Sequence, residues 1–421
     1  MSTSSMRLLY TDKEGNCYDH PTVGAVGRTG DRFLEMERED LIELPPGASL
    51  VMIPGGNPVG IFSGGRFSLV EREHGGEGPA FAVGALLPQG YTRTLLPAFR
   101  CRNAQSPLPL LGYSAVAWRR GKVYVAAAKT DNPTRWDPKH YNTPDLPGLV
   151  EAFTSELPGS RIVRQLARCS LDYGCFTAQN IFYRRWEGGL PVSRICNAGC
   201  LGCISLQPAE CCPSPQKRID FSPTVEEVSE LGIKHLEAGR DNIISFGQGC
   251  EGEPTTSADI IVKALARIRK KTPGGTININ TNAGITRAVE ELAGSGLDSM
   301  RVSLISAREE VYSRYHRPRG YSLLDVQASI RAAVGQGVFT SLNLLVFPGL
   351  TDREEEIEAL VSLIGETGVN MVQLRNLNID PDYLYANIPP AQGDIIGIEG
   401  LIDSLRSVPG VEIGNFSRPI R

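Results

Sequence analysis

Three cysteines lie close together in the chain, as Cys196, Cys200 and Cys203 in the sequence CNAGCLGC. A structural zinc site has four ligands and disulfides use cysteines in pairs, so three neighbouring cysteines fit neither arrangement by themselves. A [4Fe–4S] cluster takes one thiolate for each iron, and three thiolates leave the fourth iron open to a small molecule. We therefore interpret these cysteines as cluster ligands. The alternative is a zinc site completed by His235 or Cys211.

The other cysteines are concentrated in the same part of the chain. All but two of the ten lie between residues 169 and 250. Outside the motif this region contains Cys169, Cys175, Cys211, Cys212 and Cys250. The first four could hold a second cluster, form a redox-active pair or have no function, because their spacing matches no standard ligand pattern.

Residues 191–421 show a repeated alternation of strand-like and helix-like stretches. Strand-like stretches at 191–195, 242–246, 276–281, 300–306, 340–347 and 371–379 are each followed by a stretch with helical periodicity. Six such units predict an α/β fold with a parallel sheet, either open and doubly wound or closed into a partial (βα)6 barrel. In both, the functional site lies at the carboxyl ends of the strands.

The preceding residues have a different pattern. Residues 1–130 contain short strand-like runs broken by Gly and Pro, with the strongest hairpin signal at 114–129. Residues 131–190 contain a proline-rich linker and then a helical segment. We predict a smaller β-rich N-terminal domain that folds separately from the core at 191–421. A chain shortened to begin near Leu149 is therefore expected to keep the cluster.

A second candidate site follows the second predicted strand, in the sequence SFGQGCEGEPT. Gly249 and Gly252 would let the backbone approach a ligand closely, because glycine has no side chain. Glu253, followed by Pro254, supplies a carboxylate that can form a charge-assisted hydrogen bond with a cation. A Gly-Glu-Pro turn alone is common, but its position directly after a strand favours a role in ligand binding.

Together, the C-x3-C-x2-C motif, the order of the βα units and the Gly-Glu-Pro turn resemble those of the radical S-adenosylmethionine (SAM) enzymes. The resemblance covers roughly residues 190–421 and implies a partial TIM-like barrel with a [4Fe–4S] cluster on Cys196, Cys200 and Cys203. SAM would bind the open iron. It also implies that one electron cleaves SAM to methionine and a 5′-deoxyadenosyl radical, which abstracts hydrogen from a substrate. The protein's part in such chemistry is to bind and position the cofactors.

The same resemblance assigns further residues to SAM. The turn formed by Gly249, Gly252, Glu253 and Pro254 would bind its ammonium group. Four residues at or after the later strands would face the same site, namely Asn282, Ser303, Arg314 and Asn343. The family often has an aromatic residue just before the third cysteine, against the adenine. This chain has Gly202 there, so Leu201 or Ile204 would cover the adenine instead.

Composition narrows the choice of partners. The net charge of −4 argues against nucleic acid, which is bound largely through Lys and Arg. The sequence has no apolar run near the roughly 20 residues of a membrane span and begins without the apolar core of a signal peptide, so we expect a cytoplasmic protein with no membrane partner.

The substrate stays open between a peptide or protein and a small molecule. The resemblance implies an oxidoreductase that receives electrons from a low-potential donor such as flavodoxin or ferredoxin. The alternative function is that of an iron–sulfur electron-transfer or structural protein that does not cleave SAM.

Overall fold

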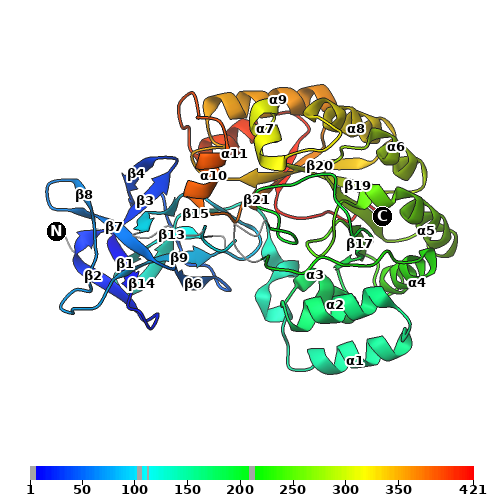
Figure 1. Cartoon of the computed structure of the whole chain (residues 1–421), viewed down its shortest axis with the longest axis horizontal. Helices are drawn as coiled ribbons and strands as arrows, with labels where there is room; N and C mark the ends of the chain where they lie inside the picture. Colours follow the sequence, from blue (N-terminus) through cyan, green and yellow to red (C-terminus); the bar gives the residue numbers. More distant parts are fainter. Residues whose placement is uncertain (1–5, 102–106, 111–112, 208–213) are drawn as a thin grey trace.

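The computed structural model describes residues 6–101, 107–110, 113–207 and 214–421. Figure 1 shows a β-rich part that contains the N-terminus and an α/β part built around a parallel sheet, with helices α1 and α2 along one side of the α/β part. The order of these parts along the chain is the predicted one.

The N-terminal part consists of antiparallel strands. A ten-stranded sheet has the order β12-β7-β2-β1-β9-β13-β14-β5, with β6 paired to β9 and β8 paired to β7, and two small sheets contain β11-β3-β4 and β10-β15. The strands are β1 (Arg7–Thr11), β2 (Cys17–Gly24), β3 (Val26–Thr29), β4 (Arg32–Glu35), β5 (Ile42–Glu43), β6 (Ser49–Met52), β7 (Gly56–Phe62), β8 (Arg66–Leu69), β9 (Phe81–Leu86), β10 (Tyr91–Arg93), β11 (Leu96–Pro97), β12 (Phe99–Cys101), β13 (Ser114–Arg119), β14 (Lys122–Val125) and β15 (Ala127–Lys129). The predicted β-rich character of this part is confirmed.

The predicted hairpin is formed by β13 and β14, which pair up to Arg119 and Lys122. The two turn residues, Arg120 and Gly121, have φ angles of +50° and +81°. Two successive left-handed residues are what a two-residue type I′ turn requires. The end of the second predicted stretch forms a separate strand, β15, which leaves this sheet and pairs with β10 instead.

The α/β part contains seven parallel strands in chain order, each hydrogen-bonded to the next. They are β16 (Glu187–Gly189), β17 (Ile243–Phe246), β18 (Thr276–Thr281), β19 (Ser299–Leu304), β20 (Phe339–Val346), β21 (Met371–Asn376) and β22 (Glu412–Gly414). Strict chain order is the topology of a barrel and excludes the doubly wound alternative. Within the described residues the two edge strands, β16 and β22, are not paired with each other, so the barrel is partial.

Helices and short 3-10 turns precede and connect these strands, and the first five of them lie between β15 and β16. They are η1 (Pro133–Trp136), η2 (Pro138–His140), α1 (Leu146–Glu156), α2 (Arg161–Leu171), α3 (Phe176–Phe182), α4 (Val225–Leu236), η3 (Pro254–Ser257), α5 (Ala258–Lys271), α6 (Thr286–Gly294), α7 (Glu309–His316), α8 (Leu323–Gly335), α9 (Glu354–Thr367), α10 (Pro381–Asn387) and α11 (Ile398–Arg406). Among the helices described, none is both long and apolar enough to cross a membrane.

The first and last strands of the barrel differ from the prediction. Residues 191–195, predicted as the first strand, follow β16 and lie outside the sheet, and β22 was not predicted at all. The backbone N–H groups of Gly252 and Glu253 donate to the carbonyls of Ser193 (2.7 Å) and Ile195 (2.8 Å). The segment thus pairs with the loop after β17, which satisfies its polar backbone groups without a place in the sheet.

The strands of the barrel alternate between apolar and polar residues, so the two faces of the sheet differ. One face packs into the main hydrophobic core with the helices, through residues such as Ile277, Ile279, Met300, Val302, Leu342, Leu344, Val372 and Leu374. The opposite face carries Asn278, Asn280, Ser299, Arg301, Ser303, Ser341, Asn343, Gln373 and Arg375. A parallel sheet buried in protein on both faces would be apolar throughout. The polar inner face of this barrel therefore indicates an interior suited to a polar ligand.

The linker between the two parts covers the open side of the barrel. Trp136 and Tyr141 are buried with Trp186, which precedes β16, and with Phe416, which follows β22. These aromatic residues fill the gap between the two edge strands. The sequence predicts a linker for this proline-rich segment, but Trp136 and Tyr141 are buried because they cover a sheet edge.

The N-terminal part shares a hydrophobic core with the barrel. Leu96 and Leu110 lie in one cluster with Leu201, Tyr315 and Leu377, so the N-terminal part and the cysteine loop share this cluster. Strand β10 also packs against β21. The domain boundary near residue 130 stays a prediction, and the shared core argues against the expectation that the two parts fold separately.

Candidate functional site

The cysteine loop lies against the end of α7. The N–H groups of Gly199 and Leu201 donate to the carbonyls of His316 and Tyr315, both at 3.0 Å, and the N–H of Arg319 donates to the carbonyl of Asn197 (2.8 Å). These contacts hold the loop over the carboxyl ends of the strands, where the fold places functional sites.

The three predicted ligands, Cys196, Cys200 and Cys203, line one cavity of about 310 Å³. Burial raises the pKa of the Cys196 and Cys200 thiols, so assembly of a metal centre on them would release protons. The guanidinium of Arg218 lies 3.6 Å from the Cys203 sulfur. Sequence reasoning missed Arg218, because a lone arginine in a polar loop carries no local signal.

The arrangement of these thiols fits a cluster better than a single ion. Across the described ranges, no three His, Cys, Asp or Glu side chains converge closely enough to hold one metal ion. In a [4Fe–4S] cluster each thiolate binds a different iron, so three separate thiols around one cavity suffice. His235, the proposed fourth zinc ligand, is buried elsewhere, with Nε2 2.8 Å from the carbonyl oxygen of Trp186. The other candidate, Cys211, lies outside the described residues.

We expect His235 to destabilise the fold at low pH. Burial lowers its pKa to about 4, from an ordinary value of 6.5, so between these values the unfolded chain binds a proton that the folded chain does not. Stability should therefore fall as pH decreases from 6.5 to 4, by at most about 1.4 kcal/mol per pH unit from this residue.

The matched variant is His235→Gln, which keeps a donor for the Trp186 carbonyl but does not titrate. In urea unfolding followed by circular dichroism, the free energy of unfolding of this variant should fall less between pH 6.5 and pH 4 than that of the wild type. The free energies of unfolding of the two proteins at pH 8 serve as the reference. Parallel pH curves for the two proteins would contradict the assignment.

The predicted Gly-Glu-Pro turn forms another wall of the same cavity, through Gly249, Gly252 and Glu253. A Cβ atom on Gly252 would lie 1.9 Å from the carbonyl oxygen of Ile195. The glycine is thus required by the close approach of the 191–195 segment. Pro254 is the buried first residue of η3 and is not part of the cavity wall.

The Glu253 side chain is buried and accepts several hydrogen bonds. Its Oε1 accepts from the N–H (3.0 Å) and the hydroxyl (2.7 Å) of Thr255 and from the hydroxyl of Thr281 (2.5 Å). Its Oε2 accepts one, from the N–H of Asn282 (2.8 Å). Burial raises the pKa of Glu253, and these donors oppose the rise. Within the described residues Oε1 has three donors and Oε2 has one, so Oε2 is the oxygen with a lone pair left for a donor from the cavity.

Glu251 is a buried carboxylate that sequence reasoning did not identify. Its Oε2 accepts from the N–H groups of Val192 (2.7 Å) and Ser193 (3.0 Å), and its Oε1 accepts from those of Gly247 (2.5 Å) and Gln248 (3.0 Å). Burial raises its pKa to about 7, against the effect of these four donors. Glu251 thus joins the segment before the cysteine loop to the loop after β17.

The later predicted SAM residues occupy different places. Asn282 and Ser303 line the cysteine cavity, and the Asn282 amide donates to the side chain of Asn197 in the cysteine loop (2.7 Å). Asn343 lines an adjoining cavity inside the barrel. Arg314 is exposed on α7 and does not line either cavity. The role of each of these residues in SAM binding stays a prediction.

The position before the third cysteine is covered by a residue from elsewhere in the chain. A Cβ on Gly202 would lie 2.7 Å from the hydroxyl oxygen of Tyr315, and Tyr315 lines the cavity. Of the two residues expected to cover adenine, Ile204 faces the cavity and Leu201 is buried in the core shared with the N-terminal part. An aromatic ring is therefore present here, supplied by α7 rather than by the cysteine loop.

Two of the remaining cysteines lie together in the core. Cys169 on α2 and Cys250 are both buried, and a hydrogen bond between their thiols lowers the pKa of Cys169 and raises that of Cys250. The N–H of Cys175 donates to the carbonyl of Cys169 (2.9 Å). Cys211 and Cys212 lie outside the described residues. A second cluster stays a prediction that iron content would decide.

Comparison with known proteins agrees with this geometry. Residues 190–362 match the model of the Radical SAM superfamily. The chain is 27% identical over 194 residues to GTP 3′,8-cyclase of Paenarthrobacter nicotinovorans, covering 45% of this chain and 50% of that protein. It is 29% identical over 171 residues to the probable GTP 3′,8-cyclase of Aeropyrum pernix, covering 39% and 44%. The chain thus spans about half the length of the curated relatives it matches.

Similar solved structures include HydG, a maturase of the [FeFe]-hydrogenase, with a TM-score of 0.40, 18% identity and coverage of 64% of this chain and 62% of that chain. Another is SuiB of Streptococcus suis bound to S-adenosylmethionine, with a TM-score of 0.39, 16% identity and coverage of 61% and 54%.

The family match coincides with the part of the chain that carries the three cysteines and strands β17 to β20 of the partial barrel. The chain thus contains a domain that matches the radical SAM superfamily of enzymes. The cofactors of this family are a [4Fe–4S] cluster and SAM, and the donor set of the cavity fits both.

Proposed function

We propose that this protein binds a [4Fe–4S] cluster through Cys196, Cys200 and Cys203, cleaves SAM reductively, and abstracts hydrogen from a substrate inside the barrel. The observation that supports this most is that the three thiols and the Glu253 turn, which come from different loops, line one cavity. When bound, the cluster supplies the electron that splits SAM into methionine and a 5′-deoxyadenosyl radical.

The residues of the chain have separate tasks in this proposal. Glu253 accepts a hydrogen bond from the ammonium group of SAM at Oε2, where it has one protein partner. Arg218 offsets negative charge beside Cys203. Tyr315 and Ile204 provide apolar surface in the cavity, which suits the adenine ring. Electrons come from a low-potential donor such as flavodoxin or ferredoxin.

The alternative is an iron–sulfur protein that carries electrons or stabilises a fold without cleaving SAM. Such a protein needs no ligand cavity beyond its cluster. Here the cysteine cavity adjoins a polar cavity inside the barrel, and Gly247, Gln248 and Ser303 line both. A second cavity beside the cluster site favours the enzyme.

The test is anaerobic incubation of the cluster-reconstituted protein with SAM and dithionite, followed by chromatography. We expect 5′-deoxyadenosine and methionine in equal amounts. Glu253→Gln should retain its iron but bind SAM about ten- to hundredfold more weakly, because a charge-assisted hydrogen bond contributes about 1.5–3 kcal/mol.

The control variant is Glu290→Gln, at an exposed position on α6, which should behave like the wild type. Absence of 5′-deoxyadenosine from protein with an intact cluster would support the electron carrier instead. A SAM affinity unchanged in Glu253→Gln would show that the ammonium group binds elsewhere.

A further inference from the structure

A second cavity, of about 580 Å³, lies inside the barrel next to the cysteine cavity. Its wall includes inward-facing residues of the strands, namely Glu187, Asn280, Arg301, Ser303, Asn343 and Arg375. The helical segment contributes Trp136 and residues 173–177, and the N-terminal part contributes Gln89. A molecule bound here would lie beside the site proposed for SAM.

Polar groups in this wall lack partners. The atoms Arg301 Nε, Asn343 Oδ1 and Gln248 Nε2 are buried, and among the described residues they have no hydrogen-bond partner. A buried polar group without a partner costs about 1–3 kcal/mol. A ligand rich in hydrogen-bonding groups would satisfy them, and an apolar ligand would not.

The charged groups of the wall are not balanced. Arg301 pairs with Glu187 at 3.0 Å, and Glu187 also accepts from the hydroxyl of Ser245 (2.7 Å). Arg375 forms no ion pair within the described ranges, and its Nη1 donates to Oε1 of the neutral Gln89 (2.5 Å). Burial lowers the pKa of Arg375 to about 10, so it is still a cation at neutral pH. The cavity therefore has one positive charge in excess.

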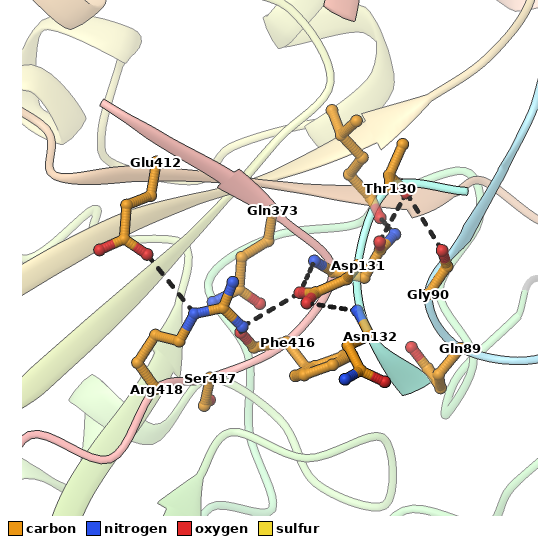
Figure 2. Close-up of polar contacts among 12 residues, drawn as sticks. Gln89, Gly90, Thr130, Asp131, Asn132, Gln373, Glu412, Phe416, Ser417 and Arg418 are labelled. Atoms are coloured by element: carbon orange, nitrogen blue, oxygen red, sulfur yellow. Dashed lines mark hydrogen bonds and ion pairs between the residues drawn. The ribbon is translucent and has the colours of Figure 1, made fainter. Parts of the chain in front are cut away.

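A hydrogen-bond network at the edge of the barrel holds the backbone next to Gln89 (Figure 2). Next to Gln89, the carbonyl of Gly90 accepts from the N–H of Thr130 (2.9 Å). The hydroxyl of Thr130 donates to Oδ1 of Asn415 (2.6 Å). The carboxylate of Asp131 accepts from Arg418 at 3.0 Å and from the N–H of Asn415 at 2.8 Å. The network ties the loop before β10 to the residues after β22.

We propose that the inner cavity binds a small polar substrate through a carboxylate or phosphate group on Arg375, and that Gln89 is the positioning residue that orients this arginine. A guanidinium presents donors on more than one edge, so Arg375 can keep Gln89 and still bind an oxyanion through two parallel hydrogen bonds. That the ligand is the substrate rests on the proposed function, whereas the anion site itself does not.

The curated relatives are GTP cyclases by name, but one excess positive charge suits a single carboxylate or phosphate group rather than a triphosphate. The N-terminal part and the helical segment wall the cavity, which favours a small molecule over a folded protein. The substrate class we infer is therefore a small molecule with one oxyanion and several hydrogen-bonding groups.

The test titrates the full-length, cluster-loaded protein with inorganic phosphate and, separately, with acetate, against chloride at the same ionic strength. The readout is the rise in the unfolding temperature. We expect at least one of the two oxyanions to stabilise the wild type more than chloride does, and Arg375→Gln to weaken that effect at least tenfold in apparent affinity. A stronger effect of phosphate indicates a phosphate-bearing substrate, and a stronger effect of acetate indicates a carboxylate.

Arg287→Gln is the matched control, because Arg287 lies on α6 with 88% of its side chain exposed, and it should respond like the wild type. Gln89→Glu gives the sharpest outcome. A carboxylate at that position pairs with Arg375 and competes with any added oxyanion, so binding should be lost while the protein stays folded. If Gln89 only stabilised the fold, the Gln89→Glu variant would not lose oxyanion binding while staying folded.

Equal oxyanion binding in the wild type and in folded Arg375→Gln would overturn the proposal, as would a wild type that does not distinguish either oxyanion from chloride. If Arg375→Gln fails to fold, oxyanion binding by Gln89→Glu decides instead. Loss of binding in this folded variant supports the proposal, and binding equal to that of the wild type overturns it. Formation of 5′-deoxyadenosine without substrate is measured in parallel. A wild type that fails to cleave SAM but binds oxyanions through Arg375 would reject the proposed function and keep the anion site.

Discussion

Replacing Cys196, Cys200 or Cys203 by alanine is expected to abolish cluster binding and, with it, all SAM cleavage. Each of the three thiols lines the same cavity, and in a site-differentiated cluster each binds a different iron. Loss of one thiolate leaves two irons without a protein ligand, so the expected result is complete loss rather than a graded decrease. The measurements are iron content per chain after anaerobic reconstitution, visible absorbance, and 5′-deoxyadenosine formation.

The control is Cys17→Ala, because Cys17 is exposed on β2 of the N-terminal sheet. This variant should keep wild-type iron and activity. Retention of SAM cleavage by any of the three loop variants would remove that cysteine from the proposed ligand set. The same iron measurement addresses the buried cysteines. About four irons per wild-type chain indicate one cluster, and about eight indicate a second.

The second large effect is expected at Arg93, which joins the N-terminal part to the barrel. Arg93 is 2% exposed, and its guanidinium donates to the carbonyls of Tyr113 (3.0 Å) and Leu377 (2.5 Å). It also lies over the ring of Phe347, at 5.5 Å from the centroid. Arg93→Ala would leave two buried carbonyls without these donors and create a cavity, at a cost of about 3–5 kcal/mol in the free energy of unfolding.

Urea unfolding followed by circular dichroism measures this cost. Arg100→Ala is the matched control, because Arg100 is exposed on β12 and lies over Phe33 at 4.8 Å. An exposed cation–π contact contributes only about 0.5–1 kcal/mol. Equal destabilisation by the two variants would show that the contact between the N-terminal part and the barrel is energetically minor.

The same contacts change what we expect of a shortened chain. A chain beginning near Leu149 lacks Leu96 and Leu110, which pack in one cluster with Leu201 of the cysteine loop. Exposure of that cluster would leave the loop without part of its support. We now expect the shortened chain to be insoluble or unable to hold iron, contrary to the expectation from sequence. Full cluster content in such a chain would restore the view of two independent parts.

The sequence by itself determined the parts of this protein that depend on local spacing. The cysteine motif lies in eight consecutive residues, and the Gly-Glu-Pro turn follows a strand directly, so both could be recognised without a structure. The parallel sheet was predicted because strand and helix periodicities are properties of short segments. Alternation in strands such as β18 and β19 even indicates which side chains share a face, since that period is fixed by backbone geometry.

Only the tertiary structure decided which distant residues complete the site. Tyr315 covers Gly202, and Arg218 reaches Cys203, although nothing local marks either residue. Gln89 meets Arg375 across 286 positions of the chain. The first strand was misplaced because a strand-like stretch such as 191–195 can pair with a loop as well as with a sheet. The Glu251 carboxylate that holds this stretch in place belongs to another segment of the chain. Such contacts depend on how packed elements meet, which short-range patterns do not encode.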